Sequence, residues 1–257
     1  MPTFVTHVVI GERVFAGMRS AGLPTDEKNY GPFLLGCILA DVNNFNGVDR
    51  RKTHFVGRLQ EDGTDAFSKS CSHFLAQLDT LLVRYWSSLT MAEQHFVAGY
   101  LCHLAADEAW KLFTWRWMHK LGIASLDKVP VPGSVVLTAF DVIGTKTYLD
   151  FPAIVSALKD AVVPNVLAHV PHQDLVNMWD TVREHALNGR TPESYFKLLE
   201  RMGKDEARIR MTRLEHEQYW QEAMSLIQDL GGIEPVMQAG VARSLDVLPQ
   251  LWSREEK

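Results

Sequence analysis

The stretch YLCHLAADEAW at residues 100–110 places His103 and Asp107 four residues apart in an otherwise apolar run. Four residues is slightly more than one helical turn, so in a helix the two polar side chains share one face. The same face continues through a mainly aromatic set: Phe96, Tyr100, Trp110 and Thr114. This spacing predicts a long helix in the core. A buried aspartate on it is costly unless it is paired or bound to a metal.

The long helix has sequence signals at both ends. Thr90, with Glu93 three residues later, is a candidate N-cap, and Gly122 marks an expected end near Leu121. Helical spacing predicts further segments at about 3–18, 30–45, 64–85, 174–188, 192–202, 204–230 and 234–251. VPVPGSVVLT at 129–138 is the one apolar β-branched run. We therefore expect an all-α fold, a multi-helix bundle around the central long helix.

Length and composition indicate one domain. A chain of 257 residues with 46% hydrophobic residues can bury one large core, so we expect a single domain over 1–257. The turn-rich stretch DKVPVPGS at 127–134 is the best candidate for a seam. It would separate a half that holds the metal-site candidates, residues 1–125, from a helical C-terminal half, residues 126–257.

Charge and cysteine content narrow the functional classes. A net charge of -5 and a pI near 6.1 argue against duplex nucleic acid as the main partner. Three scattered cysteines do not make a disulfide framework. The start, MPTFVTHVVIGERVF, has no signal-peptide pattern, and no stretch approaches 18 consecutive apolar residues. We expect a cytoplasmic protein without a membrane span, and nothing indicates its oligomeric state.

Other polar residues also occur where the pattern favours a hydrophobic one. His7 lies within FVTHVVI, Asp41 ends LLGCILADV, and His54 lies within RKTHFVG. Together with His103 and Asp107 they form a set of imidazole and carboxylate ligands that suits zinc or a similar divalent ion. The alternative for the last pair is a simple histidine–aspartate hydrogen bond in the core.

The order of these residues resembles that of the zinc-dependent phospholipase C family, which shares its all-helical fold with the fungal zinc-dependent single-strand nucleases. The resemblance covers roughly residues 1–115 and includes the threonine–histidine pair of the opening segment. It implies that Asp41, His54, His103 and Asp107 bind one zinc, and that Asp107 bridges to a second. It also implies that His7 binds a further zinc together with an N-terminal amine.

The chain departs from this family after the HxxxD pair. The family has another histidine shortly after that pair and later a histidine followed four residues on by a carboxylate. Here the helix continues with Phe113 and Trp115, and His103 is the only histidine with a carboxylate four residues later. We therefore expect one or two ions. His119, His169 and His172 are alternative ligands, whereas solvent-facing positions are expected for His73, His95, His185 and His216.

Such a site predicts hydrolysis of a phosphoric diester. A divalent ion held by histidines and carboxylates activates water and polarises a phosphoryl oxygen. Asp41 is the candidate proton acceptor, and Asp107 would orient or bridge the ions. A phospholipid headgroup, a smaller phosphodiester or a nucleotide end could be the substrate.

Three other classes of protein are compatible with a helical chain that carries polar residues in its core. Phosphohydrolases with a histidine–aspartate dipeptide are disfavoured because the chain has no adjacent His-Asp. Ferritin-like di-iron proteins are disfavoured because Glu-x-x-His is absent. The strongest alternative is a non-catalytic helical domain whose metal site is structural or vestigial and which acts in binding.

Overall fold

The computed structural model describes residues 4–55, 69–120, 131–148, 151–188, 191–229 and 231–256. Within these ranges the chain is helical and has no strand, and Leu82 and Leu167 form an isolated antiparallel bridge. The all-α prediction is confirmed. None of the helices described is long and apolar enough to cross a bilayer.

The described helices are α1 (Phe4–Ser20), α2 (Tyr30–Leu39), α3 (Asn43–Asn46), α4 (Arg50–His54), α5 (Ser70–Leu81), α6 (Met91–Lys120), α7 (Gly133–Tyr148), α8 (Phe151–Lys159), α9 (His172–Asn188), α10 (Pro192–Arg201), α11 (Glu206–Asp229), α12 (Glu234–Val247) and α13 (Pro249–Trp252). Short 3-10 turns are η1 (Glu27–Asn29), η2 (Ala40–Val42), η3 (Trp86–Ser88) and η5 (Ser253–Glu256).

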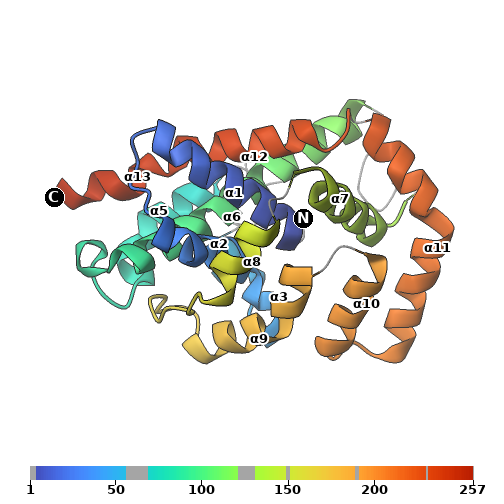
Figure 1. The fold of residues 1–257 in the computed structure, drawn as a ribbon, viewed down its shortest axis with the longest axis horizontal. Helices are drawn as coiled ribbons and strands as arrows, with labels where there is room; N and C mark the ends of the chain where they lie inside the picture. The colour runs from blue at the N-terminus through green and yellow to red at the C-terminus, as the bar shows by residue number, and fades with distance from the viewer. Residues whose placement is uncertain are drawn as a thin grey trace.

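Helix α6 is the centre of the packing. It contacts α2 most extensively, and α12, α1 and α5 also pack against it. Helix α12 lies along one side of the molecule, and α10 and α11 form a pair at one end (Figure 1). At the start of α6 the Glu93 amide donates to Thr90 Oγ1 at 3.3 Å, and the Thr90 amide donates to Glu93 at 2.7 Å. These two bonds form the predicted capping box. The predicted end of the helix at Leu121 and Gly122 lies outside the described residues, as does most of the turn-rich stretch proposed as a seam between the two halves, at 127–130.

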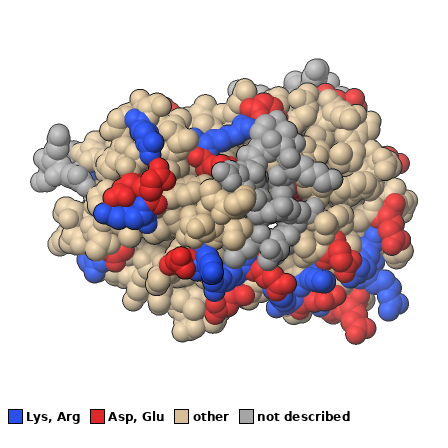
Figure 2. Space-filling view, viewed as in Figure 1, with Lys and Arg blue, Asp and Glu red and all other residues tan. Residues whose placement is uncertain are grey.

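Acidic and basic side chains are interspersed on the face shown in Figure 2, most densely over α10 and α11. Arg213 of α11 pairs with Glu193 of α10 at 2.7 Å, and Arg201 pairs with Glu184. Such mixed-sign pairs indicate a solvated helix surface, since a nucleic-acid groove would need clustered basic side chains.

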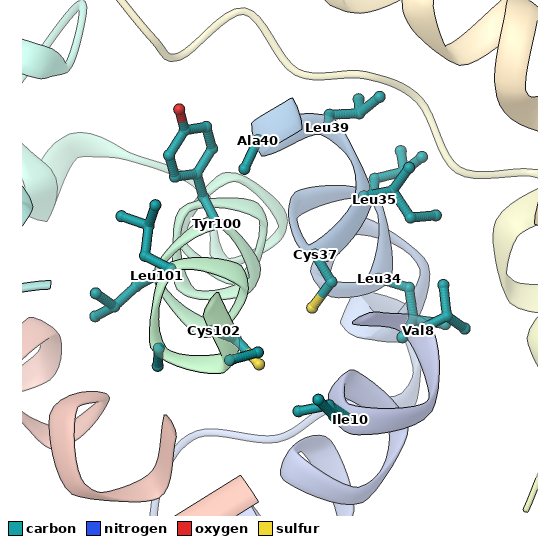
Figure 3. Packing of buried hydrophobic residues seen from close by; sticks show 14 of the residues in the cluster. Val8, Ile10, Leu34, Leu35, Cys37, Leu39, Ala40, Tyr100, Leu101 and Cys102 are labelled. Carbon is teal, nitrogen blue, oxygen red and sulfur yellow. The ribbon is translucent and has the colours of Figure 1, made fainter. Parts of the chain in front are cut away.

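The backbones of α2 and α6 touch at two glycines. A methyl group on Gly36 would lie 2.0 Å from the Phe96 carbonyl oxygen, and one on Gly99 would lie 1.9 Å from that of Phe33. Cys37 of α2 and Cys102 of α6 lie near this helix–helix contact (Figure 3). The contact fixes the C-terminal end of α2 beside the middle of α6, where His103 lies.

The segment prediction at 64–85 needs correction. The helix expected at 64–85 ends at Leu81, and its proposed start at 64–68 lies outside the described residues. The chain turns extended there because the Val83 amide donates to the Val166 carbonyl at 3.0 Å. From Gly133 onward the β-branched run at 129–138 belongs to α7, which packs against α1 and α11.

Candidate metal centre

The structure brings all five predicted metal ligands together in the core. His7 comes from α1, Asp41 from η2 directly after α2, and His54 is the last residue of α4. His103 and Asp107 lie in the middle of α6. Each of the five is at most 4% exposed. Segments distant in the sequence thus meet at one buried cluster of imidazoles and carboxylates.

The backbone of α2 orients His103. Its Nδ1 atom lies 2.8 Å from the carbonyl oxygen of Cys37. Because a carbonyl only accepts, Nδ1 carries the hydrogen and Nε2 is left with a free lone pair. Burial and the neighbouring His7 lower the pKa of His103 to about 3, so the ring is neutral at physiological pH. A neutral ring fixed by its other nitrogen is the form that binds a metal.

His54 is oriented through Thr53. Its Nδ1 atom lies 2.8 Å from Thr53 Oγ1, which is also 3.3 Å from the carbonyl oxygen of Arg50. The threonine hydroxyl can therefore donate to that carbonyl while it accepts from His54, which leaves His54 Nε2 free. Asp49 caps this short helix, and the Tyr100 hydroxyl donates to the Thr53 carbonyl at 2.6 Å.

Asp41, His54 and His103 present ligand atoms at the spacing that zinc requires. The two Nε2 atoms are 3.2 Å apart. Asp41 Oδ1 lies 3.2 Å from His54 Nε2 and 3.9 Å from His103 Nε2. Ligands placed tetrahedrally about 2.0–2.1 Å from a zinc ion are roughly 3.3 Å from one another. These three residues therefore fit one ion. Asp107 Oδ2, which lies 3.7 Å from His54 Nε2, is a further ligand atom beside them.

A second group of ligand atoms surrounds His7. Its ring stacks on that of His103, with the centroids 3.7 Å apart, and its Nε2 lies 3.6 Å from Asp107 Oδ1. Both ring nitrogens of His7 and Asp107 Oδ1 are buried and have no hydrogen-bond partner among the residues that the structure describes. Buried polar atoms are rarely left unpaired. The ligand atoms of His7, His103 and Asp107 lie within 4.8 Å of one another. An ion there would engage one ring nitrogen of His7 and Asp107 Oδ1.

Both carboxylates are in the ionised form that ligation needs. Burial by itself raises the pKa of Asp41, but contact with His54 and the nearby His103 together outweigh it and bring the pKa below its ordinary value. The pKa of Asp107 is likewise raised by burial, but contact with His7 and the nearby His103 lowers it well below the ordinary value. Metal binding requires deprotonated ligands, so this electrostatic setting favours it.

Arg50 is the member of the site that the sequence interpretation missed. Its Nη1 donates to Asp41 Oδ1 at 2.9 Å, and its Nη2 donates to Asp107 Oδ2 at 2.6 Å. Its side chain is 25% exposed, whereas the side chains of Asp41 and Asp107 are almost fully buried. A helix over 50–54 places Arg50 on the face of His54, and that spacing could have revealed it. Lys111, one turn after Asp107, is a second nearby cation, and burial lowers its pKa.

The alternative ligands do not join the cluster in the described part of the chain. His169 packs against the rings of Phe55 and Tyr100, with centroids 5.5 and 6.2 Å away. His172 begins α9, and its Nε2 lies 3.0 Å from the Val163 carbonyl oxygen. The side chains of His119 and His185 lie outside the described residues.

Two of the histidines expected at the surface are in fact buried. His95 is enclosed between the carbonyl oxygens of Met91 and Pro24, at 2.7 and 3.0 Å from its ring nitrogens. His216 is 4% exposed, and its Nε2 lies 3.0 Å from Thr138 Oγ1. Their hydrogen bonds to neighbouring oxygens explain why polar rings are tolerated there.

No protein-family model matches this chain, and comparisons with curated proteins and with solved structures also give no match. The geometry and chemistry of the cluster are therefore the basis on which a function can be assigned.

Proposed function

We propose that the protein is a metal-dependent phosphoric diester hydrolase. Zinc, or a similar divalent ion, would bind Asp41, His54 and His103, and a second ion would bind between His7 and Asp107. One observation carries the proposal: ligand atoms from three separate segments converge at the spacing of tetrahedral zinc ligands. The likeness of the residue order to the zinc-dependent phospholipase C family supports the same activity.

The residues would divide the chemistry as follows. His54 and His103 would hold the ion through Nε2, because their Nδ1 atoms are engaged by Thr53 Oγ1 and a backbone carbonyl. When bound, zinc supplies the Lewis acidity that activates water near neutral pH. Asp41 accepts a proton from the attacking water, on the side where the partly exposed Arg50 lies. Asp107 faces His7 through Oδ1 and His54 through Oδ2, so its negative charge would offset the positive charge of an ion in either ligand group.

The substrate class is the phosphodiester. Phospholipid headgroups, smaller phosphodiesters and nucleotide ends all present this group. We propose the cytoplasm as the compartment, a choice with which the three buried free cysteines are compatible.

A second candidate is a structural metal site in a non-catalytic binding domain. The burial of the ligands, each at most 4% exposed, favours it, because structural sites are closed to solvent. The two candidates differ in what removal of the metal does. A structural site gives a large loss of stability in a protein that has no turnover, whereas a catalytic site gives loss of turnover.

The test is metal content per chain in protein purified without added metal, followed by turnover of a generic aryl phosphodiester. The hydrolase proposal expects bound divalent metal and turnover that a chelator abolishes and zinc restores. His54→Gln should remove both. His216→Gln, which changes another buried histidine outside the cluster, should keep both. A parent protein that binds no divalent ion would contradict both candidates, and one that binds metal without any turnover would leave the structural one.

A further inference from the structure

Arg50 binds the same two carboxylate oxygens that face His54. Asp41 Oδ1, which accepts from Arg50 Nη1 at 2.9 Å, is also 3.2 Å from His54 Nε2. Asp107 Oδ2, which accepts from Arg50 Nη2 at 2.6 Å, is 3.7 Å from the same nitrogen. The guanidinium and a divalent ion therefore draw on the same oxygen atoms.

The charges of the cluster explain why an arginine is useful there. Two buried carboxylates repel each other, and the guanidinium that spans them leaves one net negative charge. A bound dication reverses this balance to one net positive charge. Lys111 adds a further positive charge close to Asp107. A metal-loaded site would thus attract an anion, and Arg50, as the partly exposed member, lies where that anion can reach it.

We propose that Arg50 is an exchangeable internal counterion. It holds Asp41 and Asp107 together before metal binds, yields their oxygens to the ion, and then binds the anionic phosphoryl group of the substrate. This inference rests on the proposed hydrolase function. A guanidinium suits the second role because its paired N–H groups match phosphate oxygens as well as carboxylate oxygens.

The test compares Arg50→Met with Arg51→Met. Arg51 follows Arg50 in the same short helix, but it is 62% exposed and pairs with Asp49. Titration calorimetry measures two dissociation constants. One is for zinc binding to the metal-free protein, and the other is for inorganic phosphate binding to the zinc-loaded protein. Removing a competing cation should tighten zinc binding by about 10-fold, whereas loss of a charged hydrogen-bond donor should weaken phosphate binding about 10- to 100-fold.

The opposite signs of the two changes separate this role from a purely structural one. A residue that only supports the fold would weaken zinc and phosphate binding together, and that result would overturn the inference. Unchanged constants in Arg50→Met would overturn it too, while leaving the hydrolase proposal in place. A parent protein that does not bind zinc would overturn both. Arg51→Met should match the parent in both constants.

Arg50→Lys guards against failure of the methionine variant to fold. Lysine keeps the charge but cannot span both carboxylates with a rigid fork. We expect tighter zinc binding than in the parent and a loss of phosphate affinity of about 3- to 10-fold. Phosphate affinity equal to the parent's in this variant would count against contact between Arg50 and the phosphoryl group.

Discussion

The Nε2 atoms of His54 and His103 lie 3.2 Å apart in the core, although the residues belong to different helices. Each ring is oriented by a hydrogen bond at its Nδ1 atom, with the Thr53 hydroxyl for His54 and with the Cys37 carbonyl for His103. Two imidazoles held in this way direct their free nitrogens at a common point. Such an arrangement is organised before any ion arrives, which lowers the cost of binding one.

Zinc should stabilise the fold by linkage. An ion at 100 times its dissociation constant adds about 2.7 kcal/mol to the free energy of unfolding. For a chain of 257 residues this corresponds to a rise in Tm of about 5–10 °C. Thermal melts with zinc, and with a chelator, measure the difference. The shift should vanish in His54→Gln and persist in His216→Gln, and equal shifts in the two variants would place the ion elsewhere.

Close packing of α2 against α6 should be essential for the same site. In Gly99→Ala the new methyl group would lie 1.9 Å from the Phe33 carbonyl oxygen, so the helices must separate. We expect a loss of at least about 1–3 kcal/mol and weaker zinc binding, because the Cys37 carbonyl moves away from His103. Chemical denaturation and zinc titration measure both. Gly133→Ala, where nothing lies within 4 Å of the new methyl, should change neither appreciably.

The sequence was most informative where local signals decide the structure. The Thr90–Glu93 capping box and the aromatic stripe predicted the start and the burial of α6, because both depend on residues close in the chain. The end of α5 at Leu81 was not predictable in this way. It depends on pairing with residues 166–168, and such a long-range contact leaves no periodic signal in either segment.

Within the site, the predictable residues were those whose polarity conflicts with an apolar setting, such as His7 and Asp41. Arg50 carried no such conflict because it stands in the charged run DRRKTH, next to Arg51. The burial of His216 was missed for the same reason. Charged neighbours on α11 suggested an exposed helix, but that side of the helix packs against Thr138 of α7.

Asp141 should make stability depend on pH. It is a buried carboxyl that accepts from the Thr6 amide at 3.0 Å and from the Thr6 hydroxyl at 2.8 Å, and burial raises its pKa from 3.8 to about 7. Between about pH 4 and pH 7 the folded protein therefore holds a proton that the unfolded chain has lost. Stability contributed by this group falls as the pH rises through that window, by roughly 2–4 kcal/mol.

Asp141→Asn tests this dependence. Asparagine keeps an acceptor oxygen for Thr6 and cannot ionise, so the variant should lose the fall in stability between pH 4 and pH 7. Denaturant titrations of parent and variant at pH 5 and pH 7.5 give the comparison. A parallel fall in both proteins would assign the pH dependence to other groups.

Asp107→Asn should abolish hydrolysis and lower metal affinity by at least about 10-fold, whereas Cys102→Ala should do neither. Asparagine keeps the shape of the side chain but removes a charge that faces His7, His54 and Arg50. A dication would then be less well neutralised in a core that water cannot screen. Cys102 lies on another face of α6, where its thiol donates to Ser244 Oγ at 3.4 Å.

Metal content, Tm and phosphodiester turnover of both variants separate the two proposed roles. For Asp107→Asn, a catalytic centre predicts lost turnover with a modest change in Tm. The change is modest because Arg50, the partner of Asp107, still donates a hydrogen bond to Asp41 in the variant. A structural centre predicts a large fall in Tm and a parent protein without turnover. An Asp107→Asn protein that binds metal normally and hydrolyses substrate at the parental rate would remove Asp107 from the site, and with it the link between the two ligand groups.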